Sequence, residues 1–163
     1  MEPLELKLSF ISSIGNVSRK QWQKLANPYS LLLHYDWLSL LEKSGTATAS
    51  SGWEPHHALL SAEDQLIAIA PLYLRNNSEG EFIYDEPFTK AAQDMGIPYY
   101  PKLTGMSPCT PVSAYNIMVD NDWCKQKGID RLDIKRQLLA AICRYCASEK
   151  INGLHLHFTD PAI

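Results

Sequence analysis

The segment over residues 65–75, QLIAIAPLYLR, constrains the fold most. If it is an extended strand, it carries apolar side chains on both of its faces. A strand with two apolar faces must be covered on both sides, which is typical of a sheet lying between helices. Residues 56–61 are also extended in pattern, so the three residues at 62–64 predict a hairpin turn. Pro71 cannot donate a ladder hydrogen bond, and we expect a bulge or an unpaired edge there.

The elements around this hairpin follow from the spacing of apolar residues. Alternation over 4–11 predicts a half-buried strand. Helical spacing, caps and stop signals predict helices over 18–26, 28–43, 87–95 and 130–150. Further short strands are predicted over 81–84, 115–119 and 154–158. The predicted order, an alternation of strands and helices, indicates an α/β domain.

Composition narrows the class of protein. The chain has 163 residues and 45% hydrophobic residues, enough for one domain with a core. Its formal net charge of -3 argues against a nucleic-acid binder that relies on bulk positive charge. No apolar run approaches the ~20 residues that span a bilayer. The N-terminal sequence lacks a secretion-signal pattern, so we expect a cytoplasmic protein with reduced cysteines.

Several blocks of sequence, in order along the chain, resemble one known family. They are NPYSLLLHYDWLSLLEKSG at 27–45, GWEPHH at 52–57, IAPLYLRNNSEGEFIYD at 69–85, YYPKL at 99–103 and PCTPV at 108–112. Together they resemble the N-terminal half of the FemAB-like family of the GNAT superfamily. The resemblance implies a GNAT-like α/β domain with a mixed, mostly antiparallel sheet flanked by helices.

The same resemblance implies a function. Better-characterised relatives transfer amino acids from aminoacyl-tRNA onto peptidoglycan precursors, using two GNAT-like subdomains in a longer chain. Residues 1–163 would then form one domain, the substrate-side first half of an acyl or aminoacyl transferase. The implied partners are a small-molecule or peptidoglycan-precursor-like acceptor, and an aminoacyl-tRNA or acyl-CoA donor held through a second half.

A coenzyme A site is not expected on this chain, and no other cofactor is predicted. Acetyl-CoA-binding GNAT domains normally carry a glycine-rich turn whose N–H groups hold the pyrophosphate at a helix N-terminus. Gly80 follows Arg75 at the wrong spacing for that turn. Gly128 precedes the predicted long helix, but no second glycine accompanies it.

The segment over residues 97–112 is the strongest candidate for a binding site. Its prolines fix their own φ angles and favour extended geometry in the preceding residues. Tyr99, Tyr100 and Lys102 would then project outward as ligand contacts, with Thr110 as a fourth. The structural alternative is a long crossover whose tyrosines pack on the core.

Asp85 lies just upstream and is the candidate general base of the reaction. Adjacent acidic residues at a helix start are also favourable partners of the helix dipole, so a purely structural role stays open.

A metal site is not predicted. Cys143 and Cys146 form a single pair and would need two further ligands to bind zinc. His155 and His157 could supply them, but the cysteines also extend the apolar side of a helix, where free cysteine behaves as a small hydrophobe.

A second class of function is an alternative to the transferase. A first subdomain on its own would expose apolar surface where its second half docks. The chain would then be a non-catalytic interaction module, or an inactive remnant, that forms a homodimer through that face.

Overall fold

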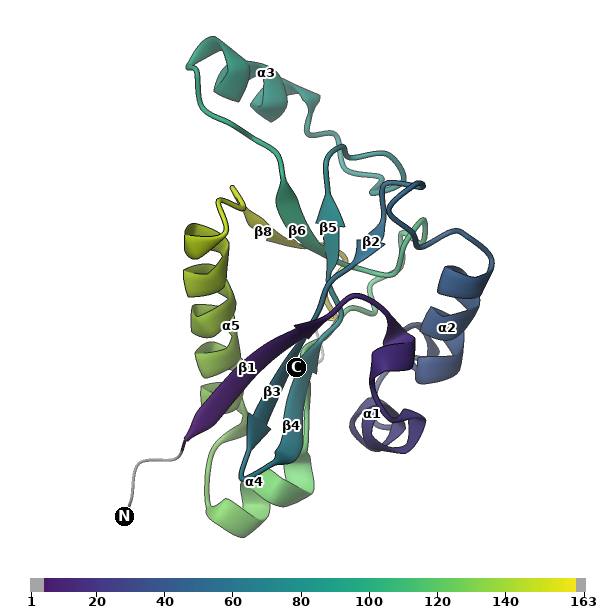
Figure 1. Cartoon of the computed structure of the whole chain (residues 1–163), viewed down its shortest axis with the longest axis vertical. Coiled ribbons are helices and arrows are strands. Elements are labelled where there is room, and N and C mark those ends of the chain that lie inside the picture. The colour runs from purple at the N-terminus through teal and green to yellow at the C-terminus, as the bar shows by residue number, and fades with distance from the viewer. Residues whose placement is uncertain (1–4, 161–163) are drawn as a thin grey trace.

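The computed structural model describes residues 5–160, whose strands form two four-stranded sheets (Figure 1). Sheet A contains, in spatial order, β1 (Leu6–Ile11), β3 (His57–Ala62), β4 (Gln65–Ala70) and β7 (Met118–Val119). Sheet B contains β2 (Glu54–Pro55), β5 (Tyr73–Arg75), β6 (Lys102–Gly105) and β8 (Leu154–Leu156). Every ladder is antiparallel except β6–β8. The predicted mixed, mostly antiparallel arrangement is therefore confirmed, with the strands divided between two sheets.

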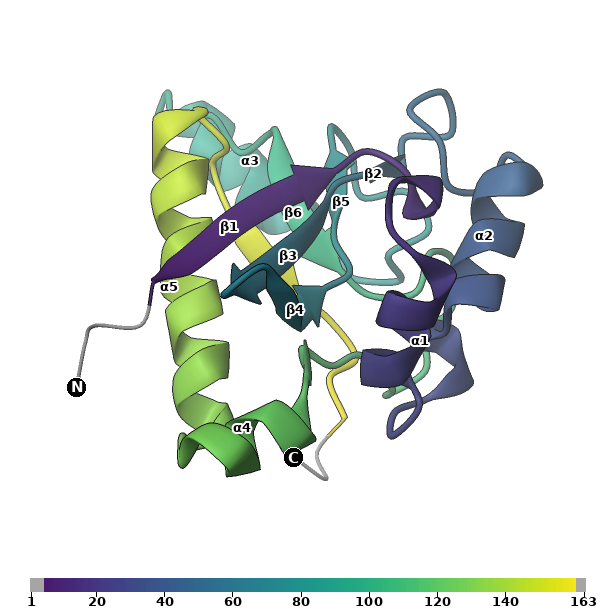
Figure 2. The same cartoon turned by 60° about the horizontal axis from the view of Figure 1, so that its bottom comes forward.

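Helices cover the strands from two sides. The helices are α1 (Arg19–Ala26), α2 (Tyr35–Lys43), α3 (Glu86–Asp94), α4 (Asn121–Lys127) and α5 (Arg131–Ser148). Figure 2 shows α1 and α2 on one side of the strands and α5 on the other. Helix α3 projects away from this body at the top of Figure 1, and it buries none of its residues. The α/β prediction with flanking helices is confirmed.

Pro71 marks the place where one hairpin passes from sheet A to sheet B. Strand β4 ends at Ala70 and β5 begins at Tyr73, so the predicted irregularity is a break between two ladders. The N–H of Leu72 donates to His57 Nδ1 at 3.1 Å, and its carbonyl accepts from the His56 N–H at 2.8 Å. These bonds satisfy backbone groups that would otherwise be buried without partners at the break.

The core is centred on β3 and β4. Residues 66–70 are all buried, as the doubly apolar sequence predicts. Trp22 of α1 and Ile134, Leu138 and Ile142 of α5 are buried in the same hydrophobic cluster. Burying apolar surface on both faces of these strands is the main driving force for the fold.

Some predicted elements differ from the structure. The strand expected over 81–84 is wrong: these residues form no strand, and Phe82 has a φ of 57°. Helix α4 was not predicted, although Asp120 caps it by accepting from the Trp123 N–H at 3.1 Å. The helix predicted over 28–43 becomes a 3-10 turn, Leu31–Leu33, followed by α2. Within residues 5–160, no helix has the length and apolar character needed to cross a bilayer.

Candidate functional site

Polar side chains line one face of sheet B. Arg75 lies opposite Lys102 in the β5–β6 ladder, and Thr104 lies opposite His155 in the β6–β8 ladder. Residues opposite one another, and residues two apart along a strand, share a face of a sheet. These four side chains therefore lie together on what we call the polar face of sheet B.

Glu81 covers the centre of this polar face and is fully buried. Its Oε2 accepts a hydrogen bond from Lys102 Nζ at 2.8 Å. Its Oε1 accepts from Thr104 Oγ1 at 3.0 Å and from Arg75 Nε at 3.3 Å. Burial alone would raise the pKa of Glu81, but nearby His157, Lys102 and Thr104 outweigh burial and lower this pKa to about 2. The carboxylate is therefore ionised at neutral pH.

Asp85 is the second carboxylate over the polar face and is only 5% exposed. Lys102 Nζ donates to Asp85 Oδ2 at 3.0 Å, and the Tyr100 hydroxyl donates to the same oxygen at 3.4 Å. Burial would raise the pKa of Asp85, but hydrogen bonds from Ser78 and Lys102 lower it below its ordinary value. A carboxylate with a lowered pKa is a weak base. This environment favours binding a cation over accepting a proton.

The prediction that Lys102 projects outward is wrong, because its side chain has 0% exposure. Burial would lower the pKa of Lys102, but the hydrogen bonds that it donates to Glu81 and Asp85 outweigh burial and raise this pKa. The ammonium group therefore stays charged between two carboxylates. It positions those carboxylates and is too deep to meet a ligand directly.

A cavity of about 300 Å³ opens beside this buried cluster. It is lined by Ile83, Asp85, Phe88, Tyr99 and His155. The rings of Tyr99 and His155 meet edge to face, with centroids 5.9 Å apart. The cavity thus combines a carboxylate, a phenol and an imidazole with two apolar walls, which suits a small polar ligand with an apolar portion.

Besides Asp85, the other two polar groups of the cavity, His155 and Tyr99, also have shifted pKa values. Partial burial and the positive charge of Lys102 lower the pKa of His155, so its imidazole is neutral at physiological pH. Burial raises the pKa of Tyr99, which therefore stays a protonated hydrogen-bond donor. The carboxylate of Asp85 can attract the ammonium form of an amine, and a neutral imidazole can accept the proton that this ammonium group releases.

The structure brings most of the predicted site residues together. Asp85 and Tyr99 line the cavity, Lys102 lies beneath Asp85, and Tyr100 packs edge to face against Tyr99 with centroids 5.0 Å apart. Tyr99 and Tyr100 are partly exposed, in line with the prediction. Thr110 lies outside the cavity lining, and its hydroxyl donates to the Pro108 carbonyl at 2.9 Å.

The sequence interpretation missed Glu81 and assigned His155 only as a possible zinc ligand. Within residues 5–160, no group of three or more His, Cys, Asp or Glu side chains is placed to hold a metal ion. Cys143 is exposed whereas Cys146 is buried on α5. The alternation of His155 with His157 was the one available signal, because it places both imidazoles on one face of a strand.

Comparison with known proteins gives the family. A FemAB-like family model, described as peptidoglycan biosynthesis/recognition, matches residues 13–163. The chain belongs to the FemAB-like family. This finding confirms the resemblance drawn from the sequence blocks. Among curated proteins, no sequence match was found.

A solved structure shows the fold of this FemAB-like chain in another protein. It is an aminoglycoside N-acetyltransferase, AAC(6')-Iy, in complex with CoA. The similarity has a TM-score of 0.53 and 11% sequence identity, and it covers 98% of this chain and 80% of that chain. At this identity the comparison supports the GNAT-type fold alone.

The start of α5 does not fit a coenzyme A pyrophosphate. Asp130 caps this helix, and its carboxylate accepts from the Leu132 N–H at 2.9 Å. Asp133 lies in the first turn of the same helix. An anion at this terminus would meet two carboxylates, although a helix N-terminus otherwise favours anions. We therefore assign no step of any reaction to coenzyme A on this chain.

Proposed function

We propose that this chain binds the acceptor amine of an acyl or aminoacyl transfer reaction. It would be the substrate-side half of a GNAT-type transferase whose acceptor is a peptidoglycan precursor or a similar small molecule. The observation that carries the proposal is the cavity where Asp85, Tyr99 and His155 meet beside the polar face of sheet B. Membership of the FemAB-like family supports the choice of acceptor.

Each lining residue has a role in this proposal. Asp85 attracts the protonated amine, and His155 accepts its proton. The free amine then attacks the acyl carbonyl of the donor and a new C–N bond forms. The donor's C–O or C–S bond breaks, and one N–H proton of the attacking nitrogen passes to the leaving oxygen or sulfur, which departs as a hydroxyl or a thiol. Tyr99 donates a hydrogen bond to the acceptor, while Lys102 holds Asp85 in place. The donor, aminoacyl-tRNA or acyl-CoA, would be held by a second GNAT-like half.

The test is calorimetric titration with a soluble peptidoglycan precursor, a nucleotide-linked muramoyl peptide that carries a free side-chain amine. Tyr99→Phe and Asp85→Asn should each weaken binding by about tenfold, since each removes a polar contact in a partly buried site. Tyr84→Phe and Asp94→Asn are matched controls at exposed positions outside the cavity lining, and they should bind like the wild type. Thermal melting of each variant separates loss of binding from loss of folding. Equal affinity in all four variants, or no binding by the folded wild type, would contradict the proposal.

The interaction module is a second candidate function, favoured by the surface over residues 82–97. Helix α3 buries no residue, and large apolar side chains of this segment are exposed. They are Phe82, Ile83, Tyr84, Phe88, Met95 and Ile97. Exposed apolar patches of this kind are typical of partner-binding surfaces. Capture of a partner that is lost in Met95→Asp, with no affinity for the precursor, would favour this candidate.

A further inference from the structure

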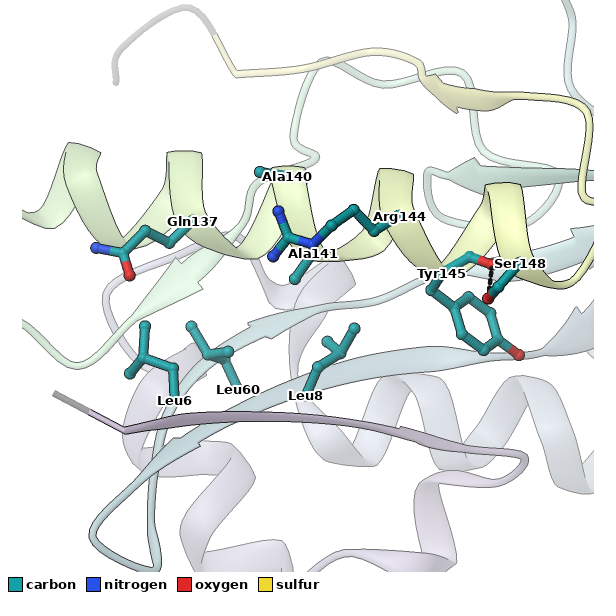
Figure 3. Close-up of a pocket in the computed structure, with 9 residues that line it drawn as sticks. All are labelled: Leu6, Leu8, Leu60, Gln137, Ala140, Ala141, Arg144, Tyr145 and Ser148. Carbon is teal, nitrogen blue, oxygen red and sulfur yellow. Dashed lines mark hydrogen bonds between the residues drawn. The ribbon is translucent and has the colours of Figure 1, made fainter. Parts of the chain in front are cut away.

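A groove of about 620 Å³ lies between β1 and α5, outside the candidate site. Its floor includes Leu6 and Leu8 of β1 and Leu60 of β3, and these side chains point toward α5 (Figure 3). Opposite them, α5 presents the small side chains of Ala140 and Ala141. Leu6 and Leu8 remain only partly buried, so the groove offers apolar surface to a ligand.

Helix α5 has two faces of different character. One face packs into the core through large side chains, including Ile134, Leu138 and Ile142. The face above the groove instead has Ala140 and Ala141 at the positions nearest the leucines. Apolar surfaces of neighbouring elements usually pack until no gap of this size is left. The alanines therefore keep open a space that one larger side chain would fill.

The groove also contains an unpaired cation. Arg144 is the one charged residue among the described residues that line it. It forms no ion pair with any residue in 5–160. Figure 3 shows its guanidinium group on the side of α5 that faces the leucines, between Ala141 and Gln137. A guanidinium fork matches the geometry of a carboxylate, and the amide of Gln137 offers a further donor.

We propose that this groove binds a medium-chain fatty acid in its ionised form. The carboxylate accepts hydrogen bonds from Arg144 and Gln137, and the alkyl chain lies on the floor formed by Leu6, Leu8 and Leu60. An apolar floor alone would accept any apolar molecule, but an unpaired cation beside it favours an anion. The proposal does not depend on the transferase function.

NMR titration of the folded chain with decanoate, below its micelle concentration, tests the ligand class. Decanoate should bind saturably with a submillimolar dissociation constant and shift the ring signals of Tyr145, which lines the groove. Octanoate should bind about tenfold more weakly, because two CH₂ groups leave the apolar floor. Decyltrimethylammonium has an alkyl chain of the same length with a cationic head, and it should bind at least about tenfold more weakly than decanoate. No saturable binding of decanoate, or equal affinity for the cation, would overturn the proposal.

Two pairs of variants test the site. Arg144→Gln should weaken decanoate binding by about tenfold, whereas Arg136→Gln, an exposed control outside the groove lining, should bind like the wild type. Ala141→Leu fills the gap and should abolish binding, whereas Ala141→Ser keeps the gap open and should retain it. Thermal melting checks that each variant is folded.

Three results with folded variants would overturn the site. The first is undiminished affinity in Arg144→Gln, which would mean that this side chain only covers the leucines with its own methylene groups. The second is undiminished affinity in Ala141→Leu. The third is a wild-type dimer in sedimentation velocity that is lost in Ala141→Leu, because a second copy of the chain would then occupy the groove.

Discussion

Sheets A and B share a hairpin but bury different kinds of side chain. In sheet A, Leu60, Ile67 and Ile69 pack in an apolar core. The polar face of sheet B instead buries two cations and two carboxylates: Arg75, Lys102, Glu81 and Asp85. Desolvating four charges is costly, and apolar residues of similar volume would often give equal or greater stability. Sheet A thus provides stability, whereas sheet B holds charged groups in the geometry that the candidate site requires.

The largest expected effect is that of Lys102→Ala, which breaks the charge balance of sheet B. Two carboxylates would remain buried with less compensation, so unfolding free energy should fall by about 3–5 kcal/mol. Urea denaturation followed by circular dichroism measures it. Lys90→Ala, at an exposed position on α3, is the control and should leave stability nearly unchanged. An equally small effect of Lys102→Ala would mean that the cluster is solvated, as expected for a lysine that faces outward.

The second largest expected effect is a loss of stability at low pH that arises from the carboxylates of sheet B and not from the apolar core of sheet A. The pKa of Glu81 is about 2 in the folded protein and has a reference value of 4.5. The unfolded chain therefore takes up this proton first as the pH falls. The contribution of ionised Glu81 to the unfolding free energy is therefore fully present above about pH 4.5, and it is lost as the pH falls through 2.

Urea midpoints of wild type and Glu81→Gln, measured from pH 6 down to pH 2, test this window. The stability difference between the two proteins should shrink as the pH falls, because protonated Glu81 resembles glutamine. Asp85 also has a lowered pKa and contributes in the same direction, so the unfolding free energy of Glu81→Gln should still fall somewhat as the pH falls. A difference that stays constant with pH would contradict the assigned role of Glu81.

A substitution in sheet A should have a moderate effect that does not depend on pH. Ile69→Val removes one buried methylene from β4 and should cost about 0.5–1.5 kcal/mol. Because Ile69 lies in the hydrophobic core cluster, the cost should be equal at pH 4 and pH 7. A cost that varies with pH would show that the two sheets are coupled more closely than this comparison assumes.

The smallest effect on stability is expected on α3. Phe88 is 67% exposed, so Phe88→Ala should change unfolding free energy by no more than about 0.5 kcal/mol. The same change should weaken precursor binding, since Phe88 forms a wall of the cavity. Urea denaturation measures the effect on stability, and calorimetric titration measures the effect on precursor binding. A large loss of stability would contradict the assignment of α3 as a projecting element.

Local pattern was enough to predict much of the fold. The doubly apolar run at 65–75 predicts a covered strand, and Pro71 predicts its interruption. The periodicity over 130–150 predicts α5 to within a few residues. The failures occur where tertiary contacts decide. The run at 81–84 has strand-like residues, but burial of Glu81 and Asp85 against Lys102 turns Phe82 and Tyr84 outward.

The candidate site was harder to predict than the fold. Tyr99 and Asp85 were identified from chemistry that is visible locally: a proline-rich segment and a carboxylate beside it. Lys102 was misplaced because its partners lie 17 and 21 positions away in the sequence. No local spacing indicates such a contact. His155 belongs to the site only because the parallel β6–β8 ladder places it beside Thr104.

The most direct test is NMR titration of the folded chain with the amine-bearing peptidoglycan precursor, observing the side-chain signals of histidines and tyrosines. Binding at the cavity should shift the imidazole signals of His155 and the ring signals of Tyr99 in a saturable manner. The signals of Tyr145, which lies on α5 outside the cavity lining, should stay unchanged. Saturable shifts at Tyr145 with none at His155 or Tyr99 would contradict the assignment of sheet B as the acceptor-binding region.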